Sequence, residues 1–314
     1  MKKSTQLEHS ILANNLMYYI YKNIDTNINI DELARDFNIS KFHLHRVFKE
    51  QIGSNIYESI KSIRLQKASN LLITNFGSTI SEIANLCGYS SQSSFIRAFK
   101  SRFKMTPKEW RRGGYKLYSN SILKSSQYAS KSLAKFDDLE PKIVKANSQL
   151  AYYIRHKGYN KNIKKIWQKL EAWIYTNEIK NYKQIGIYHD NPIITPLDKC
   201  YYIASVVIDD NKVLENTTLP YFKIPKGLYA TFEVSGEYGD ILKLIQWVYH
   251  IWLPQSGYET TTNPSYTIMH KNHFLEDSEK FRVTYYLPIN LSSTQYHSHN
   301  KMRFFIGDDK FLQD

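Results

Sequence analysis

Cysteine and long apolar runs are nearly absent from this chain. Its 314 residues include only two cysteines, Cys87 and Cys200, and no C-x-x-C spacing. This scarcity excludes a disulfide framework and a cysteine-based zinc site, so Cys87 is interpreted as a small buried hydrophobe. No apolar run approaches the length that crosses a bilayer, and the amphipathic amino terminus does not resemble a secretory signal. We therefore expect a soluble, cytoplasmic protein with no membrane partner.

Sequence signatures of catalysis are missing as well. The chain has no nucleophile elbow, no phosphate-cradling glycine loop and no dinucleotide fingerprint, so we expect neither an enzyme nor a cofactor. Four histidines, His270, His273, His297 and His299, could suggest a metal site. They fall in predicted loops without a nearby cysteine, which favours solvated histidines and no metal.

A helix-turn-helix pattern occurs twice between Ile30 and Lys104. The first copy reads INIDELARDFNISKFHLHRVFKE and the second reads TISEIANLCGYSSQSSFIRAFKS. Each copy has a small residue where its helices cross, Ala34 or Ala84, and a turn residue that tolerates positive φ, Asn38 or Gly88. The pattern further predicts N-caps at Ser40 and Ser90, and buried positions at Ile30/Ile80, Leu33/Ile83, Leu44/Phe95, Val47/Ala98 and Phe48/Phe99.

The second helix of each copy leaves one face free of core positions. Side chains there are of types that reach base edges and phosphates. Either Arg46 or Arg97 could read bases or contact only phosphate, and the alternative for the whole pattern is two ordinary helix pairs with a solvated basic face. The predicted DNA-binding residues are Lys41, Phe42, His45, Arg46 and Lys49 in the first copy, and Gln92, Ser93, Ile96, Arg97 and Lys100 in the second.

A predicted helix of about seventeen residues joins the two copies. Its length, roughly 25 Å, is less than the 34 Å or so between successive major-groove faces on one side of DNA. One chain could therefore read two adjacent groove segments if the duplex bends. Charge agrees, because residues 1–115 hold 17 Lys and Arg against 9 Asp and Glu, whereas residues 136–314 hold 21 against 20. A basic region of this kind suits a polyanion.

The stretch ISEIANLCGYSSQSSFIRAFKSRFKMTPKEWR, residues 80–111, resembles the signature of the AraC/XylS transcription regulators. The resemblance covers roughly residues 10–112. It implies an all-α double helix-turn-helix domain over residues 1–112, an operator in double-stranded DNA, and RNA polymerase as a partner. One departure is Lys104, where the family usually has a glycine at a helix end, and a left-handed lysine there would cost about 1 kcal/mol.

Residues 113–138 are rich in Ser, Lys and Asn without sustained periodicity, which predicts a linker whose second half is partly ordered. Residues 139–314 then alternate strand-like and helix-like segments, which predicts an α+β domain. Strands are expected at 150–158, 199–209, 227–236, 264–272 and 280–289, and helices at 163–177 and 240–255. The helices repeat at an offset of 79 residues, as in Tyr159/Tyr238 and Trp173/Trp252. Two strand-helix-strand-strand units would leave a groove between their sheets for a ligand.

This second half resembles the GyrI-like effector-binding domains, on the pieces YIRHKGYNKNIKKIWQKL, IGIYHDNPIITP, IPKGLYATFEVSGEYGDI, WLPQSGYE and NPSYTIMHKN. The order of the two domains is similar to that of Rob-like members of the AraC family. The resemblance implies a regulator modulated by a small aromatic or amphiphilic ligand. The alternatives for this half are a protein-interaction module and, since some GyrI-like domains act as hydrolases, a small-molecule hydrolase.

One departure affects the expected ligand. The family commonly places a glutamate where this chain has Thr267, and a buried carboxylate facing aromatic rings would select lipophilic cations. Thr267 supplies no such charge, although Glu233 or Glu259 could substitute. Abundant aromatic residues still keep a ligand cavity plausible, with core packing as the alternative for each one. The predicted ligand-binding residues are Trp167, Tyr188, Tyr229, Trp247, Tyr266, Thr267 and Tyr286.

Overall fold

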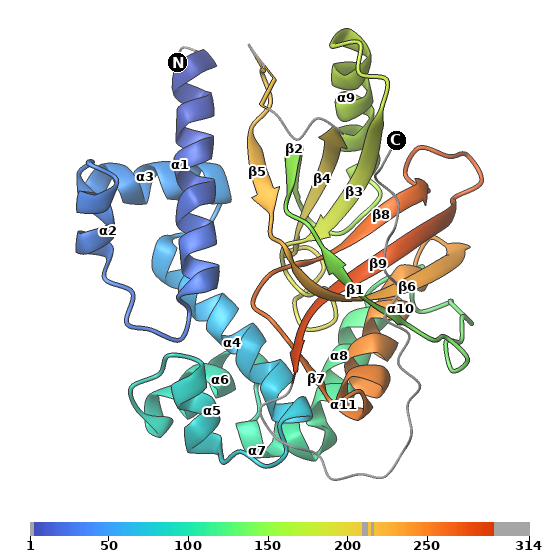
Figure 1. The fold of residues 1–314 in the computed structure, drawn as a ribbon. Helices are drawn as coiled ribbons and strands as arrows, with labels where there is room; N and C mark the ends of the chain where they lie inside the picture. Colours follow the sequence, from blue (N-terminus) through green and yellow to red (C-terminus); the bar gives the residue numbers. More distant parts are fainter. Residues whose placement is uncertain (1–2, 209–212, 215–216, 292–314) are drawn as a thin grey trace.

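A computed structural model describes residues 3–208, 213–214 and 217–291 of the chain. Figure 1 shows a helical amino-terminal region beside an antiparallel sheet that carries helices. The two regions confirm the predicted multidomain arrangement of an all-α part followed by an α+β part.

The amino-terminal region contains the predicted tandem of helix-turn-helix units, joined by one long helix. Its helical elements are α1 (Lys3–Lys22), α2 (Ile30–Asp36), α3 (Lys41–Ile52), α4 (Ile56–Thr74), α5 (Ile80–Leu86), α6 (Gln92–Phe103), α7 (Pro107–Glu109) and the π-helical turn η1 (Trp110–Gly114). The connecting helix α4 has 19 residues, close to the predicted length. Its first half packs in the core of the first unit, through Ile60 and Ile63, and its second half packs in the core of the second, through Ala68 and Leu72.

The turns follow the predicted backbone chemistry with one exception. Asn38 and Gly88 both have positive φ, at 53° and 72°. Ser40 caps α3 by accepting from the His43 amide, but the cap of α6 is Ser91, so the prediction of Ser90 was wrong by one residue. The second copy carries an extra residue in its turn, which shifts the cap along the chain.

The other predictions for this region need smaller changes. Lys104 adopts the left-handed conformation at the end of α6, with φ of 59°. Cys87 is fully buried, as expected. Ile80 and Ala98 are half-buried and lie at the rim of the core, whereas both were predicted to be inside it.

Residues 113–138 were predicted from composition to be a linker with order only in its second half. The first half instead contains a helix, α8 (Tyr115–Lys124). Tyr118 packs its ring on Phe103 and Trp110, at centroid distances of 5.4 and 5.6 Å. On its other side, Gln246 Nε2 donates to Ser119 Oγ at 2.9 Å. Ser119 and Asn120, which are among the residues that suggested a solvated linker, therefore share a tertiary partner, Gln246, that composition cannot reveal.

Within the described residues, nine strands form one antiparallel sheet. The path runs β1-β6-β9-β8-β3-β4-β2-β5, with β7 paired to β9. The strands are β1 (Lys142–Ala146), β2 (Gln149–Lys157), β3 (Tyr182–Tyr188), β4 (Tyr201–Ile208), β5 (Tyr221–Ile224), β6 (Gly227–Glu237), β7 (Tyr258–Thr260), β8 (Ser265–Lys271) and β9 (Lys280–Leu291). The five predicted strands are present as β2, β4, β6, β8 and β9.

The sheet contains two strand-helix-strand-strand repeats, whose strands are arranged symmetrically about the β3–β8 pair. In the first repeat β4 lies between β2 and β3, and in the second β9 lies between β6 and β8. Their helices are α9 (Ile163–Thr176) and the continuous run of α10 (Asp240–Trp247), the π-helical turn η2 (Val248–Trp252) and α11 (Leu253–Gln255). The predicted repeat is confirmed, but β3 pairs directly with β8. The expected groove between two separate sheets is therefore wrong, because the two halves share one sheet.

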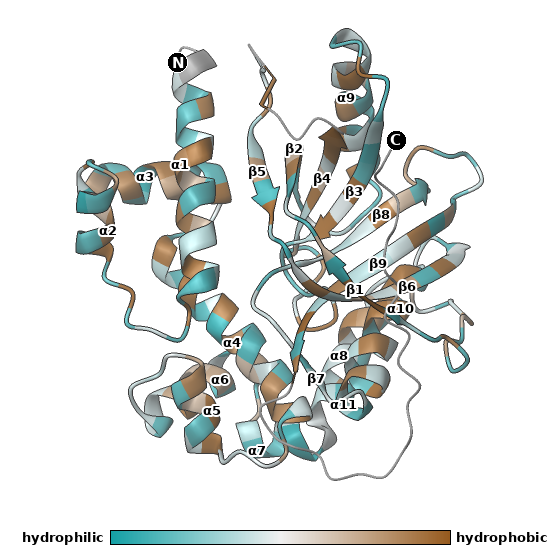
Figure 2. Cartoon of the chain, viewed as in Figure 1, coloured by the Kyte–Doolittle hydropathy of each residue, from teal (hydrophilic) through white to brown (hydrophobic). Residues whose placement is uncertain are grey.

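Side chains alternate between the two faces of this sheet and build two separate cores. One face packs against α9 and α10 and carries Tyr188, Tyr202 and Tyr285. The opposite face gathers Tyr153, Tyr266 and other residues in a cluster of its own. Strand β4 is buried along most of its length and is largely coloured as hydrophobic in Figure 2, as expected for a strand covered on both sides.

Burial of histidine makes the stability of the fold sensitive to acid. Burial lowers the pKa of His273 to about 3 from its ordinary value of 6.5. As pH falls below 6.5 the unfolded chain takes up a proton that the folded chain refuses, so the free energy of unfolding falls between pH 6.5 and pH 3. His273 contacts Phe274 and Phe281 and its two ring nitrogens have no hydrogen-bond partner among the described residues.

We predict that His273→Phe removes this part of the acid sensitivity. Chemical denaturation at about pH 7 and about pH 5 should show wild type losing about 1–2 kcal/mol more than the variant over that interval. The matched core variant Phe281→Leu removes no titrating group and should lose stability equally at both pH values. An unchanged pH slope in His273→Phe would contradict the assignment.

Candidate nucleic-acid interface

The two recognition helices, α3 and α6, expose most of their predicted contact residues. Phe42 has 78% of its surface exposed, which is unusual for a phenylalanine in a folded chain. His45 and Ile96 are half-buried, and Ile96 also packs against the core. The remaining predicted residues are exposed, namely Lys41, Arg46, Lys49, Gln92, Ser93, Arg97 and Lys100.

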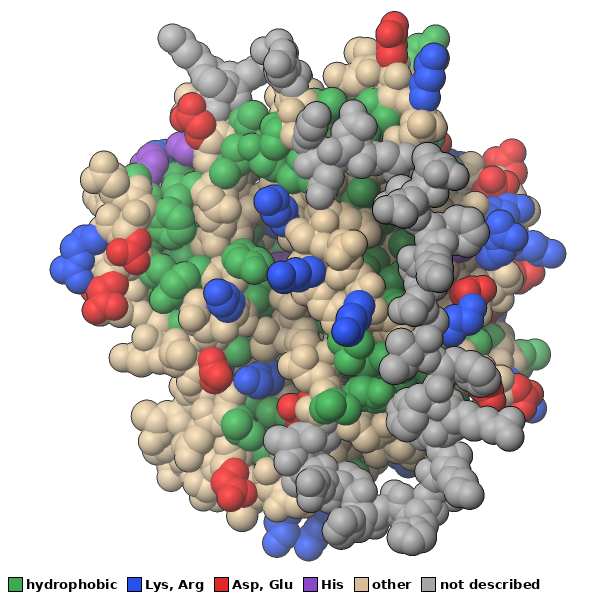
Figure 3. All heavy atoms as spheres, in the orientation of Figure 1, with side chains coloured by type: hydrophobic (Ala, Val, Ile, Leu, Met, Phe, Trp, Pro, Cys, Tyr) green, Lys and Arg blue, Asp and Glu red, His purple; other side chains and the backbone are tan. Residues whose placement is uncertain are grey.

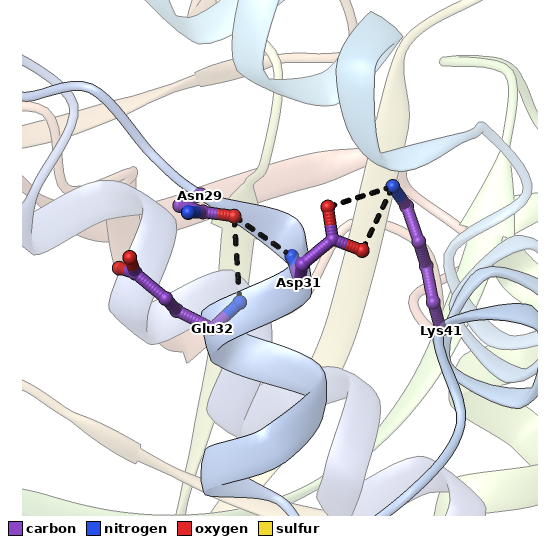
Figure 4. A network of polar contacts seen from close by, with 4 residues as sticks. All are labelled: Asn29, Asp31, Glu32 and Lys41. Carbon is purple, nitrogen blue, oxygen red and sulfur yellow. Dashed lines mark hydrogen bonds and ion pairs between the residues drawn. The ribbon is translucent and has the colours of Figure 1, made fainter.

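Local capping and an ion pair fix the start of α3. Asn29 caps α2 by accepting from the amides of Asp31 and Glu32, at 3.0 and 3.4 Å. Lys41 Nζ, in the first turn of α3, lies 3.0 Å from the Asp31 carboxylate, so the pair ties α2 to α3 (Figure 4). Contact of Lys41 with a phosphate would compete with this surface pair, which costs little to break.

The two equivalent arginines differ in their surroundings. Arg46 donates to His43 Nδ1 at 3.1 Å and lies 3.6 Å from the Glu50 carboxylate, one turn further along α3. Arg97 forms neither an ion pair nor a hydrogen bond with another residue in the described part of the chain. The Arg97 guanidinium therefore has no ion pair or hydrogen bond in the described structure that would have to break before it contacts a base or phosphate.

Sequence reasoning missed one exposed aromatic side chain beside this surface. Tyr57, in the first turn of α4, has 56% of its surface exposed, and its ring lies 5.6 Å from that of His45. The sequence signal for it was its position in the first turn of the helix, two residues after the Asn55 cap.

The first helix-turn-helix unit is docked on the first repeat of the sheet. Asn14 Nδ2 donates to the Tyr221 carbonyl at 3.2 Å, and the Tyr153 hydroxyl donates to Asn14 Oδ1 at 2.9 Å. Arg155 donates to the Gln51 carbonyl at 2.8 Å. These contacts join α1 and the end of α3 to β2 and β5.

The second unit is docked through α4, α6 and α8. Arg102 donates to Ser62 Oγ at 2.7 Å and to Thr195 Oγ1 at 3.1 Å, and burial lowers the pKa of this guanidinium. Asn70, in α4, donates to Thr260 Oγ1 in β7 at 3.1 Å. The sheet domain therefore contacts both units, and Figure 1 shows the two units to the left of the sheet.

The predicted ligand-binding residues do not line one cavity. Trp167, Tyr188 and Thr267 lie on the helix-covered side of the sheet, where Thr267 donates to the Gly186 carbonyl at 3.2 Å. Tyr229, Tyr266 and Tyr286 lie together on the opposite face, where Tyr266 stacks on Tyr286 and Tyr229 meets both rings edge-on. Trp247 is half-buried on α10. The reason is the two-residue period of a strand, which sends neighbours such as Tyr266 and Thr267 to opposite faces.

The two acids named as alternatives to a carboxylate at Thr267 lie in different surroundings. Glu233 is exposed and lies 3.3 Å from Lys142. Glu259 is half-buried on β7, where burial raises its pKa and Lys67 lowers it.

Figure 3 shows Lys and Arg side chains near the middle of the face in view, so positive charge is not confined to the recognition helices.

The histidine prediction holds only in part. His270 is exposed, but it lies in strand β8 and not in a loop as predicted, and its Nε2 lies 2.8 Å from Thr284 Oγ1. His273 is buried, so the expectation of a solvated side chain was wrong there, because three aromatic rings surround it. His297 and His299 lie outside the described residues. Over the described ranges, no three His, Cys, Asp or Glu side chains are placed to hold a metal.

A bilayer-spanning helix is not found in the part of the chain that the structure covers, since none is both long and apolar enough.

Comparison with known families finds one match in each half of the chain. Residues 33–113 match the family described as "Helix-turn-helix domain", and residues 139–290 match the "GyrI-like small molecule binding domain". The xylose operon regulatory protein of Escherichia coli K12 is 38% identical over 95 residues, which are 30% of this chain and 24% of that protein. The chain thus spans about a quarter of the length of that relative.

Two further similarities cover the separate halves. The probable transcription factor PqrA of Proteus vulgaris is 33% identical over 105 residues, which are 33% of this chain and 85% of PqrA. The crystal structure of the EcmrR carboxyl-terminal domain is 15% identical with a TM-score of 0.37, over 49% of this chain and 99% of that one.

Two exposed recognition helices on one chain, followed by an α+β domain, define the class of DNA-binding transcription regulators. Within that class, the chain belongs to the AraC family, and it carries a GyrI-like small-molecule-binding domain after its helix-turn-helix units.

The assignment of Ser91 as the cap of α6 can be tested directly. Ser91→Ala should lower the free energy of unfolding by about 1 kcal/mol, because the Ser94 amide loses its acceptor. Ser90→Ala is the matched control and should change it by a few tenths of a kcal/mol. Urea denaturation of both variants decides the matter, and a larger loss in Ser90→Ala would reverse the assignment.

Proposed function

We propose that this protein is a sequence-specific transcription regulator that grips two adjacent major-groove segments of double-stranded DNA with α3 and α6. The observation that carries the proposal is the pair of exposed polar faces on two helices held by one stiff connector. Helix α4, with its 19 residues, is about 28 Å long. This is shorter than one DNA turn, so full seating of both helices favours a bent duplex.

The residues in contact with DNA would be those predicted from the sequence. Arg46 and Arg97 suit guanine or phosphate, and Gln92 suits adenine through two hydrogen bonds. Phe42 presents an apolar ring that suits a thymine methyl group, and His45 and Ser93 complete the set of discriminating residues. Lys41, Lys49 and Lys100 are suited to phosphates, with Ile96 packed between the face and the core.

The second domain would bind a small aromatic or amphiphilic effector and change the activity of the first. A ligand regulates only if it prefers one arrangement of the two domains over another. The contacts of the effector domain with α1, α4 and α8 support such coupling, because any shift between the repeats strains both units.

Three further parts of the proposal concern organisation and partners. The division is a DNA-binding domain at 1–112, a linker at 113–138 and an effector domain at 139–314. RNA polymerase would be the protein partner, through a surface left exposed on the DNA. The protein would act without catalysis, in the cytoplasm beside its operator.

DNA binding by both units is tested with two arginine variants on an operator selected from a random pool. Arg46→Ala and Arg97→Ala should each weaken specific binding by about 1–3 kcal/mol in a mobility-shift titration at fixed salt. Arg282→Ala, an exposed arginine on β9, is the control and should bind normally. Normal binding by both recognition-helix variants would reject the assigned roles, and affinity independent of salt would reject the DNA interface itself.

A further inference from the structure

A cleft of about 340 Å³ lies where α8, residues 134–137 and the α10–η2 helix meet. Its walls come from the segment 113–138, which follows the second helix-turn-helix unit, and from the α10–η2 helix of the second sheet repeat. The volume is within the range of small-molecule sites. Of the predicted ligand residues only Trp247 lines the cleft.

Three lysines from three different segments surround this cleft. They are Lys116 on α8, Lys135 in the segment after α8, and Lys243 on α10. Among the described residues none of the three has an ion pair or a hydrogen bond. One acid, Asp137, lines the same cleft. The excess of two positive charges around a concave surface attracts an anion, because a recess concentrates the field of its walls.

The floor of the cleft supplies rings and hydrogen-bond donors. Phe136 lies 6.4 Å from Trp247, and both line the cavity. The indole nitrogen of Trp247 can only donate a hydrogen bond. It is buried and has no acceptor in the described structure. His250 is buried and makes no hydrogen bond to a described residue, and burial, with Lys116 nearby, lowers its pKa to about 4. A neutral imidazole and an unsatisfied indole N–H can bind an acceptor.

One irregular turn borders the cleft. The π-helical turn η2 carries His250, whose ring lies 4.7 Å from that of Tyr115 at the start of α8. The π-helical turns of proteins are rare and often occur at functional sites.

We propose that this cleft binds an anionic small molecule with an aromatic body, its carboxylate or similar group held by Lys116, Lys135 and Lys243. The inference rests on the proposed function and gives its effector a site and a chemical class. A bound anion would neutralise repulsion between lysines on α8 and α10, and so hold the second helix-turn-helix unit to the effector domain. A cation would meet the same lysines and be repelled.

The test is a fluorescence-anisotropy titration of the full-length chain with two dyes. Fluorescein is an anionic xanthene, and rhodamine 6G has the same ring system with a positive charge. Fluorescein should bind at least about tenfold more tightly. Lys116→Gln and Lys243→Gln should each weaken it about fivefold, and Trp247→Phe should weaken it by removing the indole donor.

The internal repeat provides a matched control for the lysine variants. Lys164, on α9, occupies the position of Lys243 at the 79-residue offset and is exposed. Lys164→Gln should bind fluorescein as wild type does. Equal or tighter binding of rhodamine 6G, an equal loss in Lys164→Gln, or no fluorescein binding by wild type would each overturn the proposal.

Mobility shifts without dye separate this inference from the proposed function. Normal DNA binding with no fluorescein binding rejects the cleft and leaves the regulator intact. Loss of DNA binding in Lys116→Gln and Lys243→Gln, with fluorescein binding unchanged, would assign these lysines to phosphates and overturn the proposal. Absence of specific DNA binding by wild type rejects the proposed function, whatever the dyes do.

Discussion

The arrangement of the two recognition helices depends on the burial of α4 in two cores at once. Ile60 and Ile63 pack with α1 and α3, and Ala68 and Leu72 pack with α5, α6 and Trp110. Trp110 Nε1 also donates to the Ser69 carbonyl at 3.0 Å, which ties the end of the second unit to the same helix. Both units pack against one continuous helix. Neither unit can therefore rotate relative to the other without disturbing its own packing against α4.

The effector domain reinforces this constraint from outside. Its first repeat contacts α1 through Asn14, its second contacts α8 through Gln246, and β7 contacts α4 through Thr260. The repeats are joined across the β3–β8 pair, from Gln184 to Tyr188. A ligand that alters the joint between repeats, or the packing of α8, would therefore act on the spacing of the two units directly.

Much of the helical region was predictable because its signals are local. Asn38 and Gly88 marked turns, and the spacing of Leu44, Val47 and Phe48 marked the buried face of α3, which left its opposite face for DNA. Helix α8 was missed because its Ser and Asn residues are satisfied by Gln246, a partner 126 residues or more away. The short strands β5 and β7 carry too few residues for a pattern. The predicted ligand residues were placed in one group although side chains alternate along a strand. Tyr266 and Thr267 are neighbours in a strand, so their order alone places them on opposite faces.

A fixed distance between the two DNA-reading units, set by α4, is best tested by measuring binding affinity for a respaced operator. In that operator the two contacted segments are moved apart by roughly 5 base pairs, half a helical turn. We expect specific binding to be lost, because the second recognition helix then faces the wrong side of the duplex. Unchanged affinity would contradict a fixed spacing, since the two units would then bind independently.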